Sequence, residues 1–211
     1  YHIDAAYGGF FLLTKEGAAK MEGIEMADSI VMDPHKSLFL PYGSGVVLFK
    51  SADKAREVLH YSASYMQDVI EEQNQVSPAD ISIELTKHFR GLRFWLPLKL
   101  HGIGPFRAAL AEKLLLAQYA QQKLNKIKGI VVGPDPDLSI VTFRYENGLS
   151  DSNKENQSII DWFHNDGRVF ISSTAIEEKI VLRFAILVYR THIDQVNLAI
   201  DILNDAIRQL R

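Results

Sequence analysis

The chain has 211 residues, 47% of them hydrophobic, which is enough for one large domain or two small ones, each with a buried core. Its net charge of -3 argues against a nucleic-acid-binding face, which would need concentrated basic residues. The chain has no cysteine, which excludes disulfides, thiolate metal sites and cysteine nucleophiles, and no apolar run approaches the roughly 20 residues of a membrane span.

The chain opens on Tyr1-His2-Ile3-Asp4, without a methionine and as if in the middle of a strand. We therefore expect it to be the C-terminal part of a longer protein. The absence of cysteine fits a reducing compartment, so we expect a cytoplasmic protein.

In the first half of the chain, short apolar stretches alternate with turn signals. The polar stretch 62–78 has no long apolar stripe and is predicted to be a loop, and loops of that length inside a compact domain are usually functional or disordered. The pattern predicts strands over 2–6, 29–32 and 46–49, a turn over 41–45, and helices over 15–21, 52–59 and 81–101.

From Pro105 onward, the pattern predicts a second, strand-and-helix domain. Pro105 is placed at a helix start, where its fixed φ is favourable, and Gly129 stops that helix. We therefore expect two domains, over 1–104 and 105–211. The apolar stripe of the predicted long helix comprises Phe106, Leu110, Leu114, Ala117, Leu124 and Ile127.

The remaining elements of the second domain follow from the same patterns. Thr191 is a plausible N-cap of the last helix, with Asp194 at the capping-box position. The buried stripe of that helix is predicted to be Val196, Ile200, Leu203 and Ile207. Strands are predicted over 130–132, 140–145, 169–172 and 180–185, and a further helix contains 159–163 and ends near Gly167.

Two residues of the first half could carry chemistry together. Asp4 ends the first predicted strand and Lys36 follows the second, with an interval long enough for a crossover between parallel strands. Ligands of open α/β sheets bind beyond the carboxyl ends of strands, which would place an acid and an amine at one crevice. Each residue alone has a plainer interpretation, because such an aspartate commonly forms a turn or a cap and a lone lysine is commonly a surface charge.

Several motifs, in order and spacing, resemble one family. HIDAAYG at 2–8, ADS at 27–29 and DPHK at 33–36 are similar to the signature of the pyridoxal-phosphate-dependent amino-acid decarboxylases, the family of aromatic-L-amino-acid decarboxylase and glutamate decarboxylase. The resemblance covers nearly the whole chain, and it continues through YGSG at 42–45, FRGLRFW at 89–95 and VLRFA at 181–185.

The resemblance implies a role for each matching residue. Lys36 matches the lysine that forms the internal Schiff base with pyridoxal 5'-phosphate, and Asp4 matches the acid that pairs with the pyridine nitrogen. Ala6 matches the small residue against one face of the ring, and His35 matches the histidine beside the lysine, near the phosphate. Tyr65 matches a catalytic-loop tyrosine that protonates the substrate carbon after CO2 leaves.

One position departs from the family pattern. The family often has asparagine where this chain has Asp33, and a carboxylate near a phosphate would repel it. Either Asp33 points elsewhere or a cation offsets its charge. Arg90 and Arg93, three residues apart, are interpreted as a structural ion-pair face rather than as anion clamps, and the histidines show no metal-ligand spacing.

The resemblance implies an α/β fold of the pyridoxal-phosphate-dependent transferase fold type I, here the C-terminal part of the large domain plus a small C-terminal α/β domain. It implies a carboxy-lyase with an L-amino acid as substrate, preferably an aromatic one, and a homodimer for the full-length enzyme. We expect no nucleic-acid, membrane or metal partner, and we expect this chain alone to be inactive and to bind the cofactor poorly.

Two alternatives stay open. Another fold type I enzyme, such as an aminotransferase or a lyase of phosphorylated amino-alcohols, would share the aspartate and lysine pair, although Tyr65 and the downstream Arg-Phe-Ala segment favour a decarboxylase. A catalytically silent scaffold would keep the fold without the reaction, which the presence of Asp4, Lys36 and Tyr65 argues against.

Overall fold

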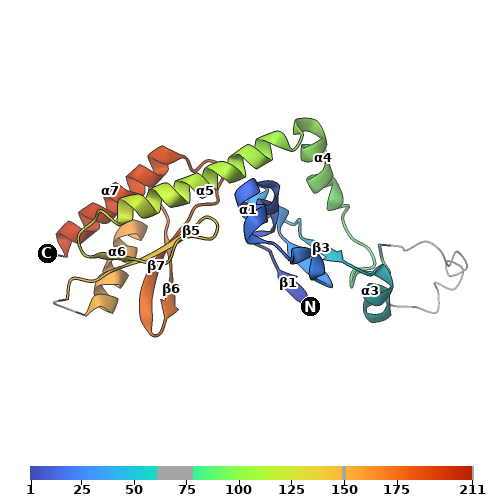
Figure 1. Cartoon of the computed structure of the whole chain (residues 1–211), viewed down its shortest axis with the longest axis horizontal. Coiled ribbons are helices and arrows are strands. Elements are labelled where there is room, and N and C mark those ends of the chain that lie inside the picture. Colours follow the sequence, from blue (N-terminus) through green and yellow to red (C-terminus); the bar gives the residue numbers. More distant parts are fainter. Residues whose placement is uncertain (61–77, 149–150, 211) are drawn as a thin grey trace, which may run out of the picture. The chain divides into compact units, whose positions relative to one another are not determined.

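The computed structural model describes residues 1–60, 78–148 and 151–210 (Figure 1). The chain forms two compact units. The first unit consists of Tyr1–Phe10 and Met21–Gly102, and the second unit consists of Phe11–Lys20 and Ile103–Arg211.

The first unit contains a three-stranded sheet of β1 (His2–Asp4), β2 (Ser29–Met32) and β3 (Val46–Phe49) in that order. Strands β1 and β2 are parallel and β2 and β3 are antiparallel, which confirms the predicted crossover. The connection from β1 to β2 contains the 3-10 helix η1 (Gly9–Leu13), the helix α1 (Lys15–Lys20) and the 3-10 helix η2 (Ile24–Met26).

Three α-helices belong to the described part of the first unit: α2 (Pro34–Ser37), α3 (Ala52–Leu59) and α4 (Gly91–His101). The sequence specifies α3 through its cap, because the Ser51 hydroxyl accepts a hydrogen bond from the Lys54 N–H at 3.4 Å. The bounds of α3 confirm the helix predicted over 52–59.

The long helix predicted over 81–101 is wrong in its first half. Only α4 is helical, and it begins after Arg90. Local side-chain contacts compete with a helix upstream of it, since the Ser82 hydroxyl accepts from the Glu84 N–H at 3.3 Å and the Glu84 carboxylate pairs with Arg90. The apolar residues of 81–90 suggested a helix, but the contacts of the polar residues among them favour an irregular conformation.

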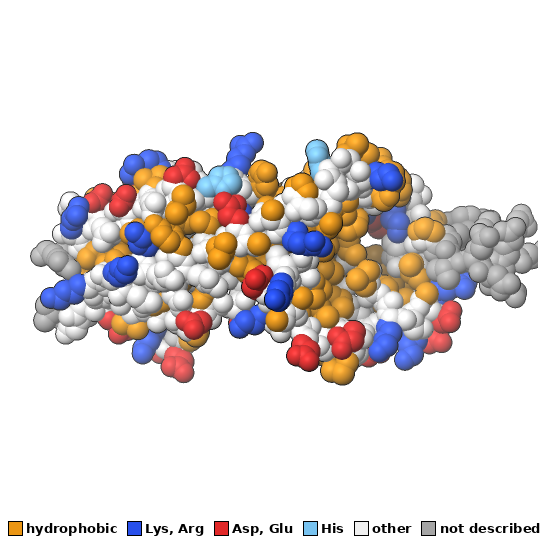
Figure 2. Space-filling view, turned by 45° about the horizontal axis from the view of Figure 1, so that its top comes forward, with side chains coloured by type: hydrophobic (Ala, Val, Ile, Leu, Met, Phe, Trp, Pro, Cys, Tyr) orange, Lys and Arg blue, Asp and Glu red, His pale blue; other side chains and the backbone are white. Residues whose placement is uncertain are grey.

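Helix α4 carries many exposed apolar side chains and buries none of its residues. Figure 2 shows apolar side chains gathered over parts of the molecular surface. Exposed apolar side chains of β3 and α4 include Val47, Leu48, Phe49, Leu92, Trp95, Leu96 and Leu100. Exposed apolar surface of this extent commonly marks a site of contact with another polypeptide segment.

The second unit is built on a four-stranded antiparallel sheet with the order β4-β5-β7-β6. Its strands are β4 (Ile130–Val132), β5 (Ile140–Tyr145), β6 (Ser172–Ile176) and β7 (Lys179–Ala185). Its main helices are α5 (Gly104–Leu124), α6 (Ser152–Asp166) and α7 (Ile193–Gln209).

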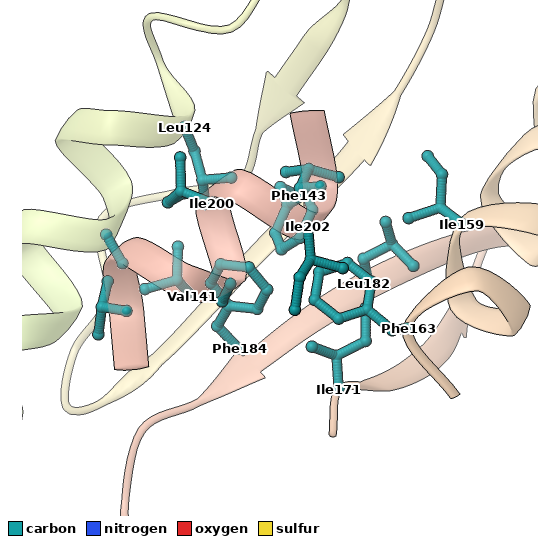
Figure 3. Close-up of a cluster of buried hydrophobic side chains, with 14 of the residues drawn as sticks. Leu124, Val141, Phe143, Ile159, Phe163, Ile171, Leu182, Phe184, Ile200 and Ile202 are labelled. Carbon is teal, nitrogen blue, oxygen red and sulfur yellow. The ribbon is translucent and has the colours of Figure 1, made fainter. Parts of the chain in front are cut away.

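One continuous core lies between these helices and the sheet. Alternate residues of β5 and β7 point into it, as the period of a half-buried strand requires. The predicted stripes of α5 and α7 contribute to the buried surface, and this confirms the helical periodicity. Figure 3 shows this core around Leu124, Val141, Phe143, Ile159, Phe163, Ile171, Leu182, Phe184, Ile200 and Ile202.

The strand predicted over 169–172 is wrong, because β6 begins at Ser172 and pairs with β7 in a hairpin. The two residues between them, Glu177 and Glu178, have φ of 49° and 63°. A two-residue hairpin turn with both φ positive usually carries asparagine or glycine, so two glutamates gave no turn signal.

Two helix ends also differ from the prediction. Helix α5 ends at Leu124, so Ile127 lies in the turn that follows it. The N-cap of α7 is His192 rather than Thr191, and the Gln195 side chain accepts from the His192 N–H at 2.7 Å in place of the predicted Asp194. Glutamine at this position completes a capping box as glutamate does.

A fully buried lysine fixes the segment that leads into α7. The Lys113 amine donates to the carbonyl oxygens of Tyr189 at 3.1 Å and Thr191 at 2.6 Å, and to the Glu112 carboxylate at 2.9 Å. Burial raises the pKa of Glu112, but hydrogen bonds from His192 and Lys113 outweigh it and hold that pKa below its ordinary value. The Glu112 carboxylate therefore stabilises the fold at neutral pH, and this contribution is lost in acid as the pH falls through the lowered pKa.

We expect Lys113→Met to lower the free energy of unfolding by about 2–4 kcal/mol, because two backbone carbonyls and a partly buried carboxylate lose the fully buried amine that donates to them. Urea unfolding followed by circular dichroism measures this change. Lys126→Met removes an exposed lysine in the same unit and should change stability by less than about 0.5 kcal/mol. Equal midpoints for the two variants would contradict the structural role of Lys113.

Among the helices of residues 1–60, 78–148 and 151–210, none combines the length and hydropathy needed to cross a lipid bilayer.

Candidate active site

The carboxyl ends of β1 and β2 lie side by side, as the sequence predicted. Asp4 is opposite Val31 in the parallel register, and the Ala5 N–H donates to the Val31 carbonyl at 2.9 Å. Beyond the strand ends, the Asp33 N–H donates to the Ala6 carbonyl at 3.2 Å. The segment that follows Asp4 is therefore hydrogen-bonded to the segment that leads to Lys36.

The Asp4 side chain is held by the backbone just beyond it. Its Oδ1 atom accepts a hydrogen bond from the Ala6 N–H at 3.0 Å, a local contact that aspartate commonly makes at the end of a strand. Asp4 is exposed and Ala6 is partly buried. The carboxylate thus has a defined orientation at the sheet edge and is accessible to a ligand.

Lys36 lies on α2, a single turn whose start is set by Asp33 and Pro34. Proline suits the first turn of a helix, where its missing N–H is not needed. The Lys36 Nζ lies 2.8 Å from the Asp33 Oδ2, and the lysine side chain is 42% exposed. The amine is therefore accessible and is paired with a carboxylate.

His35 is fixed from two sides. Its Nδ1 lies 2.9 Å from the Ser44 carbonyl oxygen, and because a carbonyl only accepts, Nδ1 must carry the hydrogen. Its ring stacks on that of Tyr42 with centroids 4.7 Å apart. These contacts leave Nε2 facing the Asp33 carboxylate at 3.8 Å.

The predicted turn over 41–45 supports this histidine. The Ser44 hydroxyl donates to the Pro41 carbonyl at 2.9 Å, and Gly43 has φ of 81°, which favours glycine. The Arg93 guanidinium donates to the Tyr42 carbonyl at 2.9 Å. Sequence reasoning did not find the Arg93 contact, because the two residues are 51 positions apart in the chain.

Asp33 does not point away from the site. Its carboxylate lies between the Lys36 amine and the His35 imidazole, so neighbouring cationic or protonatable groups offset its charge. Of the two possibilities that the sequence left open, the structure favours the offset charge. Its link to Lys36 was missed, because an aspartate in this position is more often a helix cap.

The remaining candidates are a tyrosine, two arginines and possible metal ligands. Tyr65 lies outside the described residues. Arg90 pairs with Glu84 and Arg93 binds a backbone carbonyl, which supports their structural interpretation. Among the residues that the structure describes, no group of three or more histidine, aspartate or glutamate side chains could hold a metal ion.

An acid and an amine lie at the shared carboxyl edge of two parallel strands in a mixed α/β fold, an arrangement compatible with the pyridoxal-phosphate-dependent enzymes of fold type I. The pyridoxal-dependent decarboxylase conserved domain matches residues 1–146. The chain belongs to this family.

Relatives and solved structures agree with this assignment. The chain is 33% identical over 195 residues to the aromatic-L-amino-acid decarboxylase of Bacillus atrophaeus, which covers 90% of this chain and 41% of the relative. Its fold matches Oryza sativa TDC solved with PLP and tryptamine, with a TM-score of 0.92 at 20% identity, over 99% of this chain and 44% of that one. It also matches Catharanthus roseus tryptophan decarboxylase in complex with L-tryptophan, with a TM-score of 0.87 at 21% identity, over 99% of this chain and 43% of that one. The chain thus spans about two fifths of the length of these relatives.

The residues present fit the family's cofactor, pyridoxal 5'-phosphate. A primary amine can bond its aldehyde, a carboxylate can accept from its protonated ring nitrogen, and a small side chain beside the acid leaves room for the flat ring. Lys36, Asp4 and Ala6 supply these three features at one sheet edge. The orientation of Asp4 by the Ala6 N–H is the structural observation that favours this fit.

Proposed function

We propose that the protein containing this chain is a carboxy-lyase that converts an L-amino acid to an amine and CO2 with pyridoxal phosphate. The observation that carries the proposal is the juxtaposition of the Asp4 and Lys36 segments at the carboxyl ends of two parallel strands. The family assignment and the decarboxylase relatives support it.

Each site residue has a defined task in this proposal. Lys36 attaches the cofactor through its amine, and His35 lies beside it. Asp4 accepts a hydrogen bond from the ring nitrogen, and its negative charge favours the protonated form of that nitrogen by opposite-charge attraction. When bound, the cofactor acts as an electron sink for the bond that breaks at the substrate's α-carbon.

The proposed substrate is an aromatic L-amino acid. The support comes from relatives, which include the Bacillus atrophaeus enzyme and tryptophan decarboxylase 2 of Oryza sativa subsp. japonica. The two solved structures above contain tryptamine or L-tryptophan, both indole compounds.

The test is to incubate the purified whole protein and pyridoxal phosphate with each aromatic amino acid and to measure CO2 and amine. We expect equal amounts of both products for at least one substrate. The 211-residue chain alone, assayed in parallel, is expected to give neither product and to hold the cofactor poorly. An oxo acid product would instead indicate an aminotransferase, and a protein without turnover would indicate a silent scaffold.

Tyr65 is proposed as the proton donor to the α-carbon after CO2 leaves. A phenol can act as a general acid when it reaches the carbon, and such groups typically contribute about a hundredfold or more to rate. We expect Tyr65→Phe to release amine about a hundredfold more slowly and to form side products, with cofactor content unchanged. Product analysis by mass spectrometry checks this, and normal amine production would remove Tyr65 from the mechanism.

We also propose a homodimer for the whole protein and a cytoplasmic location. The exposed apolar side chains of β3 and α4 support a contact with another polypeptide segment. The absence of cysteine supports a reducing compartment.

A further inference from the structure

Asp33 uses its side chain in a way that its position does not predict. It stands at the N-cap of α2, where aspartate usually accepts a hydrogen bond from an N–H of the first turn. In the described part of the chain its carboxylate makes no such capping bond, and Oδ2 lies 2.8 Å from the Lys36 amine instead. The acid thus pairs with the lysine that the family match assigns to the cofactor.

The two partners of this ion pair differ in freedom. The Asp33 backbone is held on both sides, since its N–H donates to the Ala6 carbonyl at 3.2 Å and its carbonyl accepts from the Lys36 N–H at 2.9 Å. The Asp33 side chain is 18% exposed, whereas the Lys36 side chain is 42% exposed. Asp33 is therefore the less mobile partner. The longer and more exposed Lys36 side chain has room to approach the carboxylate and to leave it.

His35 gives the same carboxylate a second partner. Its Nε2 lies 3.8 Å from Asp33 Oδ2, and the Ser44 carbonyl and the Tyr42 ring hold the imidazole in place. When Lys36 is elsewhere, the carboxylate can still pair with this imidazole in its protonated form, in which Nε2 also carries a hydrogen. The Asp33 carboxylate therefore has a partner whether Lys36 lies beside it or is bound to the cofactor.

We propose that Asp33 is a positioning residue that receives the Lys36 ammonium each time the lysine is released from the cofactor. The role rests on the proposed function, in which the substrate amine displaces Lys36. In that exchange the substrate nitrogen would take the place of the Lys36 nitrogen as the group bound to the cofactor. The two protons that the substrate ammonium loses are gained by the lysine nitrogen, which leaves as an ammonium. The Asp33 carboxylate then holds this cation within reach of the site for its return.

The contact itself is tested on the whole protein after its cofactor has been removed. Each lysine is acylated with an amine-reactive reagent, and the labelling rates are measured by mass spectrometry for the wild type and for Asp33→Asn. An ammonium held by a carboxylate reacts slowly, so we expect Asp33→Asn to raise labelling of Lys36 about two- to fivefold, as for a partly exposed ion pair. The other lysines should not change.

Two further variants make this measurement specific. Asp33→Glu keeps the charge and should keep labelling of Lys36 within about twofold of the wild type. Asp53→Asn removes an exposed carboxylate from the first turn of α3 and should leave labelling of Lys36 unchanged. Unchanged labelling of Lys36 in a folded Asp33→Asn variant, verified by circular dichroism, would overturn the proposal.

The role in the reaction is tested on the whole protein with its cofactor. We expect Asp33→Asn to lower kcat about three- to tenfold with cofactor content unchanged, and Asp33→Glu to restore most of it, because return of the lysine is slowed and not its chemistry. A kcat equal to that of the wild type would overturn the role. A wild-type protein that releases no CO2 would refute the proposed function, whereas the labelling result would still decide whether Asp33 holds Lys36.

Discussion

Replacement of Lys36 by alanine in the whole protein is expected to reduce amine formation below detection. In the proposed mechanism, the amine of Lys36 binds the cofactor and binds it again after each turnover. Alanine removes both tasks, because its side chain has no amine. The measurement is CO2 release together with the amount of cofactor retained after gel filtration.

A covalent readout separates this prediction from a general loss of activity. Borohydride reduction of the cofactor-loaded wild type, followed by peptide mapping, should place the label on Lys36. Lys36→Arg keeps a cation beside Asp33 but cannot form the bond, so it should lose the label and the activity as alanine does. Lys50→Ala removes an exposed lysine of the same unit and should retain both. A label on another lysine would show that Lys36 is not the attachment site.

For Asp4→Asn we expect amine formation to fall about a hundred- to a thousandfold, the range seen when one charge-stabilising group is removed from an active site. Asparagine has nearly the same shape, and its carbonyl oxygen can still accept from the Ala6 N–H. The variant therefore keeps the turn and loses only the negative charge. Without that charge, the ring nitrogen no longer has a partner that favours its protonated form.

The decisive comparison is between attachment and turnover. Asp4→Asn should still bind the cofactor covalently through Lys36, seen as absorbance of the bound group, while CO2 release falls. Asp53→Asn serves as the control for loss of an exposed carboxylate in the same unit and should keep normal turnover. Normal turnover of Asp4→Asn would show that Asp4 does not act on the ring nitrogen.

Sequence reasoning succeeded where one local signal determines an element. The bounds of β2, β3 and α3 agree with their predictions, because apolar runs and the Ser51 cap define them. The predicted meeting of the Asp4 and Lys36 segments followed from strand order alone, and the parallel register confirms it.

Sequence reasoning failed where a nonlocal or competing contact determines the local conformation. The Glu84 and Arg90 ion pair replaces the first half of the predicted helix, and the turn at Glu177 and Glu178 adopts positive φ without a glycine. The pairing of Asp33 with Lys36 was hidden, because capping and ion pairing use the same side chain and only the folded geometry shows which one occurs.

The path of the chain through η1 and α1 limits where this protein can be truncated. Segment Phe11–Lys20 connects the strands that carry Asp4 and Lys36, yet it packs with the second unit, where the Arg107 guanidinium donates to the Leu13 carbonyl at 2.8 Å and Lys20 pairs with Asp137 at 3.1 Å. A cut after Gly102 would therefore leave the crossover without its packing partners. Because the crossover segment Phe11–Lys20 belongs to the second unit, truncation studies of the site should keep the two units on one polypeptide.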